Sequence, residues 1–79
     1  MQTPEPRCLE RIDASRNMAR FYALSIEPTL FGDAALVREW GRIGTPGRRR
    51  LDLYPSVANA HDALRRLAQA KVTRGYRPR

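Results

Sequence analysis

A tryptophan between two arginines is the pattern in this sequence that most directly suggests a binding chemistry. Side chains at alternate positions of a β-strand project to the same side, so Arg38, Trp40 and Arg42 would lie together on one face of an extended segment. An indole ring stacks on bases or sugars, and guanidinium groups fork onto phosphate oxygens. The pattern predicts a nucleic-acid contact centred on Trp40. The alternative is that Trp40 is simply the largest residue of the core.

The segment that follows Trp40 concentrates positive charge. Residues 44–47, Gly-Thr-Pro-Gly, form a turn signal that is followed directly by three arginines, Arg48, Arg49 and Arg50. Because they are close to Trp40, these side chains would contact phosphates. The alternative is a hairpin whose arginines are only solvated, as is usual for a run of charges alone. The segment is not a phosphate-binding P-loop, because the Gly-x4-Gly-Lys-Ser/Thr spacing is missing.

The charge of the chain also favours a polyanionic partner. Fifteen basic residues, all arginine except Lys71, stand against eight acidic residues, which gives a net charge of +7 over 79 residues. Cys8 is the only cysteine and His61 the only histidine, so we expect no disulfide, no metal and no cofactor. No nucleophile, acid–base pair or metal constellation is visible, so we expect no enzyme. Without a long apolar run or a signal-peptide core, we expect a cytoplasmic protein with no membrane contact.

The surrounding sequence predicts how these residues are held. Strand-like patterns cover residues 8–13, 20–27, 35–43 and 49–54, and the short turns between them favour antiparallel pairing. Apolar residues then recur at steps of three and four over residues 57–74, the spacing of one helical face, with Ser56 as the N-cap and Gly75 at the exit. The sequence predicts an α+β fold, a small antiparallel four-stranded sheet with one long C-terminal helix packed on one face.

The predicted core lies between that helix and the sheet. Six apolar side chains are expected under the helix: Tyr22, Leu24, Ile26, Val37, Leu51 and Leu53. If Val37 and Ile43 face the helix, alternation along the strand places Trp40 on the opposite, open face of the sheet. Residues 1–6 contain two prolines and little apolar content, so we expect a disordered lead-in there and the domain at residues 7–78.

Residues 40–47, Trp-Gly-Arg-Ile-Gly-Thr-Pro-Gly, resemble the WGR domain, a family named for that tripeptide. Three further segments are similar to it: the Arg-Phe-Tyr-Ala-Leu strand at 20–24, the Tyr-Pro-Ser helix entry at 54–56 and the Lys-to-Tyr helix exit at 71–76. The resemblance covers residues 8–78 and implies a small antiparallel sheet with a helix across it.

The resemblance also implies a function. In poly(ADP-ribose) polymerases the WGR domain binds DNA at a break, where the motif tryptophan packs against a terminal nucleotide and the motif arginine helps bridge the DNA to other domains. The matching positions here are Trp40 and Arg42. The chain carries neither the zinc fingers nor the catalytic domain of those polymerases, so the resemblance implies a stand-alone module of the bacterial type.

We therefore expect a non-catalytic, monomeric module that binds nucleic acid, with DNA favoured over RNA, at strand ends or unpaired nucleotides. Its expected contacts are Trp40, Arg42, Arg38, Arg48, Arg49 and Arg50. The alternative is a protein-interaction module that uses the same face, because tryptophan and arginine are also favoured anchors of protein interfaces.

Overall fold

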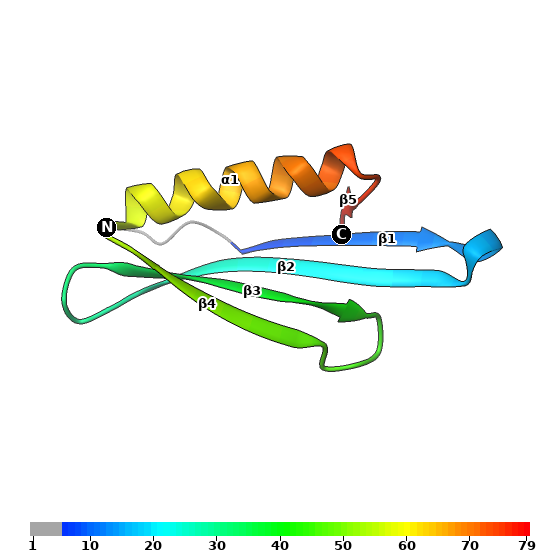
Figure 1. Cartoon of the computed structure of the whole chain (residues 1–79), viewed down its shortest axis with the longest axis horizontal. Helices are drawn as coiled ribbons and strands as arrows, with labels where there is room; N and C mark the ends of the chain where they lie inside the picture. The colour runs from blue at the N-terminus through cyan, green and yellow to red at the C-terminus, as the bar shows by residue number, and fades with distance from the viewer. Residues whose placement is uncertain (1–5) are drawn as a thin grey trace.

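A computed structural model describes residues 6–79, so nearly all of the expected lead-in at residues 1–6 lies outside the described residues. The elements follow one another as β1 (Arg7–Asp13), η1 (Ala14–Arg16), β2 (Met18–Pro28), β3 (Ala34–Arg42), β4 (Arg48–Tyr54), α1 (Val57–Thr73) and β5 (Arg77–Pro78). The strands form one antiparallel sheet in the order β4-β3-β2-β1-β5, and α1 runs along one face of it (Figure 1). The predicted α+β class and the single helix are confirmed.

The sheet has five strands where the sequence predicts four. The fifth is β5, whose two residues pair with Leu9 and Glu10 of β1 after the chain has left the helix. A strand of two residues is too short to show alternation, so no pattern in the sequence could indicate it. Its effect is to tie the C-terminal segment to the far edge of the sheet (Figure 1).

Both ends of α1 are set by local hydrogen bonds that the sequence indicates. The Ser56 hydroxyl accepts a hydrogen bond from the Asn59 amide at 3.1 Å, as an N-cap does. At the other end Gly75 has a φ of +98°, and the amides of Gly75 and Tyr76 donate to the carbonyls of Val72 and Lys71, both at 3.0 Å. This is a Schellman motif. It turns the chain back sharply, so that Tyr76 is buried against the sheet.

The core lies between α1 and the helix-side face of the sheet. Its buried members from the strands are Leu9, Tyr22, Leu24, Ile26, Ala34 and Leu36. From the helix and its exit they are Ala60, Ala63, Leu64, Ala68 and Tyr76. Three of the four buried residues of α1 are alanines, and such small side chains let the helix axis approach the sheet closely. Partly buried Trp40 and Tyr54 pack against the margin of this core.

The prediction that Val37, Leu51 and Leu53 lie under the helix is wrong, and so is the outward direction of Trp40. Directly paired residues of neighbouring strands share a face. Trp40 is paired with Tyr22 and therefore faces the helix side, whereas Val37 is paired with Leu51 on the open face. Leu51 and Leu53 are 55% and 68% exposed.

The reason for this error lies in the first half of β3. The four residues from Ala34 to Val37 are all buried, at 0–8% exposure, so both faces of the strand are covered there. A segment buried on both faces is apolar throughout and carries no alternation from which its phase could be predicted. Ile43, the other residue used for the phase, lies beyond the end of β3.

Candidate functional site

Trp40 belongs to a row of aromatic rings beside the C-terminal end of α1. It lies opposite Tyr22 in the β2–β3 pair, with 6.4 Å between the ring centroids and 29° between the ring planes. Tyr76, which the helix exit turns inward, meets the Tyr22 ring edge-on, also at 6.4 Å. Both contacts are within the range of favourable aromatic pairs. The indole is therefore held in a fixed position at the margin of the core.

Lys71, in the last turn of α1, places a cation over these rings. Its Nζ is 4.5 Å from the centroid of Tyr22 and 5.4 Å from that of Tyr76, which are cation–π distances. Burial, followed by the positive charges of Arg74, Arg20 and Arg38, lowers the pKa of Lys71 below its ordinary value of 10.5. Lys71 thus stands among like charges, an arrangement that a bound anion would relieve.

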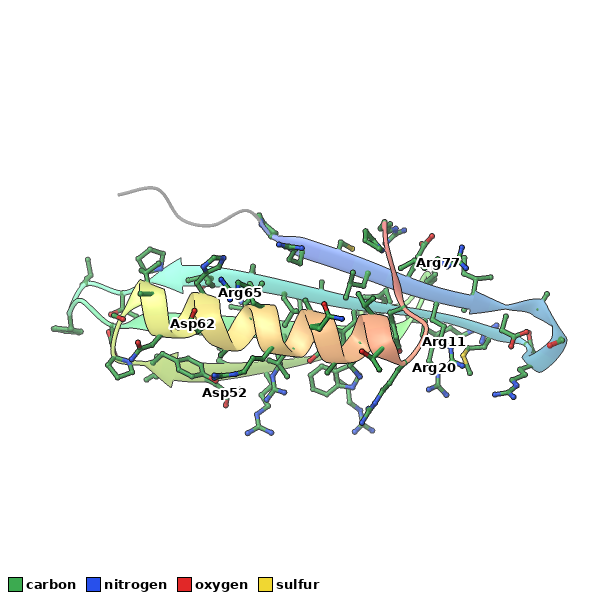
Figure 2. The ribbon with its side chains drawn as sticks, turned by 90° about the horizontal axis from the view of Figure 1, so that it is seen from above. Arg11, Arg20, Asp52, Asp62, Arg65 and Arg77 are labelled. Atoms are coloured by element: carbon green, nitrogen blue, oxygen red, sulfur yellow. The ribbon has the colours of Figure 1, made fainter. Side chains whose placement is uncertain are left out.

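These side chains surround an open groove of about 470 Å³ between the end of α1 and strands β2 and β3. No aspartate or glutamate within residues 6–79 lines this groove. Figure 2, which looks onto the helix-covered face, shows Arg20 beside the C-terminal end of α1, close to Arg11. The lining residues of the groove are Arg20, Phe21, Tyr22, Trp40, Gly41, Arg42, Lys71 and Tyr76.

Arg42, the arginine of the Trp-Gly-Arg motif, is oriented by the turn between β1 and β2. Its Nη1 donates to the Asn17 carbonyl at 3.2 Å, and Asn17 adopts a left-handed backbone conformation with a φ of +50°. The acceptor is a neutral oxygen, so the hydrogen bond orients the guanidinium without neutralising it. Among the described residues no carboxylate forms an ion pair with Arg20, Arg42 or Lys71.

Arg38 differs from Arg42 in having an acidic partner. Its Nη2 donates to Asp52 at 2.8 Å, and Arg50 donates to the other oxygen of the same carboxylate at 3.2 Å. Burial opposes the charge on Arg38, but the proximity of Tyr22 and Asp52 outweighs it and raises the pKa of Arg38. Its Nε is buried with no partner among the described residues. Asp52 therefore holds two arginines in place beside the groove.

The three arginines after the turn do not share one face. Arg48 is paired with Trp40 and Arg50 with Arg38, so both belong to the helix side. Arg49 faces the open side, where its Nη2 is 3.9 Å from Glu27. The structure thus brings five of the six predicted contact residues to one side of the sheet and separates Arg49 from them.

Six of the eight groove residues were not among the predicted contacts: Arg20, Phe21, Tyr22, Gly41, Lys71 and Tyr76. Each lies in a segment that resembles the WGR domain, so the resemblance contained a signal for them. The pattern of charges contained no signal for Arg20 or Lys71, because a single arginine on a strand and a single lysine on a helix are ordinary surface residues. Only the tertiary fold brings them together.

The motif glycine has a packing role. A Cβ at Gly41 would lie 2.7 Å from the Cα of Gly47, and a Cβ at Gly47 would clash with the Trp40 carbonyl and lie 2.9 Å from the Phe21 ring. Gly47 also has a φ of +72°, which other residues rarely adopt. The two glycines therefore allow the turn between β3 and β4 to fold back against β3, beside Trp40 and Arg42.

Within residues 6–79, no three His, Cys, Asp or Glu side chains come together as metal ligands would. The one helix there is too short and too polar to cross a membrane. Cys8 is exposed, with a free thiol.

Comparison with known proteins assigns the family. The model of the WGR domain matches residues 5–79, so this chain belongs to the WGR domain family, as its sequence motifs indicate. One curated relative is the protein named "Uncharacterized protein y4dW" of Sinorhizobium fredii (strain NBRC 101917 / NGR234), which is 52% identical over 71 residues. That alignment covers 90% of this chain and 35% of the relative, so the chain spans about a third of its length. No solved structure matches.

Proposed function

We propose that this chain binds nucleic acid through the helix-side groove and catalyses no reaction. Trp40 provides the stacking surface, and Arg20, Arg42 and Lys71 contact phosphates. The observation that carries the proposal is the meeting of these three cations, none paired with a carboxylate in the described chain, around a fixed aromatic row. WGR domains of poly(ADP-ribose) polymerases bind DNA, which supports DNA as the first ligand to test.

The aromatic ring of Trp40 and the cations around it contribute to affinity in different ways. Stacking of a base on an aromatic side chain contributes about 1–3 kcal/mol and tolerates any sequence. The cations provide attraction that weakens with salt: about three phosphate contacts on duplex DNA correspond to a slope of roughly −2.7 in log K against log salt concentration.

Fluorescence anisotropy of labelled oligonucleotides tests this proposal with a variant on each face of the sheet. Trp40→Leu keeps an apolar side chain at the core margin and removes the stacking surface, so we expect affinity to fall roughly 5- to 150-fold. Leu53→Ala, on the open face, is the matched control and should bind as the unaltered chain does. Circular dichroism of both variants verifies the fold.

Two results would refute the proposal. One is undiminished affinity in a folded Trp40→Leu variant. The other is the absence of salt-dependent binding of any DNA or RNA by the unaltered chain, which would favour the protein-interaction alternative.

A further inference from the structure

The groove at Trp40 continues along α1 as part of a longer trough. A second hollow, lined by Tyr22, Arg38, Trp40 and Lys71, shares three of these residues with the groove. A third hollow lies further along the helix and shares Arg38 with the second. Its lining residues are Arg38, Tyr54, Ala63, Arg66 and Leu67. We call these three hollows, which lie between α1 and strands β2, β3 and β4 and share lining residues, the trough.

Cations and aromatic rings both extend along the trough. Arg20, Arg42 and Lys71 lie at its Trp40 end. Arg38, which shares Asp52 with Arg50, lies in the middle, and Arg66 lies at the far end, beside Tyr54. No described aspartate or glutamate lines any of the three hollows. A polyanion that enters at Trp40 would therefore meet positive charge and a second aromatic ring further along the helix.

The length of the trough sets the length of its ligand. Tyr54 is paired with Ala34, six residues before Trp40 on β3. At a rise of about 3.3 Å per residue, the two rings are separated by about 20 Å along the strand. A nucleic-acid strand advances about 3.4 Å per nucleotide when its bases are stacked, so roughly six nucleotides fit and fewer fit if the strand is stretched.

We infer that the trough binds a single strand of nucleic acid running between Trp40 and Tyr54, an inference that rests on the proposed function. A duplex keeps its bases paired and stacked inside, so only its phosphates and its end could meet the trough. An unpaired strand offers phosphates to the cations and free base faces to the rings, which is how sequence-tolerant single-strand binders work. The ligand is accordingly a gap, an overhang or a free single strand.

Adjacent arginines on α1 make this inference testable. Arg66 lines the trough, whereas Arg65 lies on the β1 side of the helix, where Figure 2 shows it away from Asp52 and β4. Arg66 also borders the hollow on the β1 side, but no aromatic side chain among the described residues lines that hollow. The two variants Arg66→Gln and Arg65→Gln remove the same charge from the same helix, one inside the trough and one outside it.

The experiment is a length series measured by anisotropy: oligothymidine of 3, 6, 9 and 12 nucleotides, the same lengths of oligouridine, and a blunt DNA hairpin. Affinity should rise up to about six nucleotides and then level off, and the 12-mer should bind more tightly than the hairpin. Arg66→Gln should weaken the 9-mer about 2- to 5-fold, the range of an exposed ion pair, and leave the 3-mer unchanged. Arg65→Gln should change neither. Tight binding of either oligothymidine or oligouridine supports the inference. Whichever of the two binds more tightly identifies the preferred strand as DNA or RNA.

Two outcomes would overturn the inference while leaving the proposed function intact. The first is binding that does not depend on length and is as tight for the hairpin as for the 12-mer. The second is an equal loss in Arg66→Gln and Arg65→Gln, which would mean that only net charge matters. If the unaltered chain binds none of the oligonucleotides, the proposed function itself fails.

Discussion

The helix side and the open side of the same sheet carry charge in different ways. On the helix side, at the last turn of α1, Arg20, Arg42 and Lys71 surround Trp40 with no carboxylate paired to them in the described chain. On the open side, Arg49 has Glu27 within 3.9 Å, and the exposed side chains include the aliphatic Leu51 and Leu53. The proposed function depends on this difference: unpaired positive charge gathers around Trp40, whereas the charge of Arg49 on the open side has an acidic neighbour.

The position of the site follows from where the helix stops. The Schellman motif at Gly75 ends α1 before it covers the first residues of β2 and the last residues of β3, which pair with each other. Trp40 is therefore packed against the core on one side and borders the groove on the other. A longer helix would bury it, and a shorter one would remove Lys71 from the rings. The helix exit thus contributes to the core and to the site at once.

The largest contrast between the two faces is expected in stability. Leu64 on α1 is 1% exposed in the core, and Leu53 is 68% exposed on the open face. Leu64→Ala should lower the free energy of unfolding by about 2–5 kcal/mol, because it leaves a cavity. The same substitution at Leu53 should change it by less than about 0.5 kcal/mol. Urea unfolding followed by circular dichroism measures both values, and similar losses would contradict the assignment of the two faces.

A smaller contrast is expected in the salt dependence of DNA binding. Arg42→Gln removes a proposed phosphate contact, so the slope of log K against log salt should become shallower by about 0.7 for a single strand and 0.9 for a duplex. Arg49→Gln removes the same charge from the open face and should leave the slope unchanged. Anisotropy titrations at four salt concentrations give both slopes. A larger change of slope in Arg49→Gln than in Arg42→Gln would place the contact surface on the open face and contradict the proposal.

The smallest effect concerns the pH dependence contributed by Lys71. Its pKa in the folded chain is below the 10.5 that it regains on unfolding, because of burial and the neighbouring arginines. Between these two pKa values the unfolded chain binds more protons, so stability rises with pH in that window, and the cost of the buried charge is fully present below it. The stability of the unaltered chain should therefore improve relative to Lys71→Met as pH increases from 7 towards 10. A difference between the two that does not change with pH would contradict this account.

Much of the fold could be predicted from local patterns. The helix from Val57 to Thr73, its cap at Ser56 and its exit at Gly75 depend on hydrogen bonds between near neighbours, and the sequence indicates all three. The phase of β3 could not be predicted, because residues 34–37 are buried on both faces and do not alternate. That one ambiguity was enough to put Trp40 on the wrong face.

The site shows the same division between local and tertiary information. Spacing along one strand brings Arg38, Trp40 and Arg42 together correctly, since it depends only on the pleat. Arg20 and Lys71 reach the groove from another strand and from the helix, so no local pattern contains their relation to Trp40. Arg49 was grouped with its neighbours by sequence, and alternation along β4 turns it to the other face.

The fluorescence of Trp40, the only tryptophan in the chain, tests the central claim most directly. The emission should begin at a wavelength between those of buried and fully solvated indole, because Trp40 is partly buried beside the groove. Titration with a 12-nucleotide oligothymidine should quench it saturably, with an affinity that falls steeply as salt is raised. Unchanged emission at concentrations where anisotropy reports binding would contradict the account, because the nucleic acid would then be bound away from Trp40.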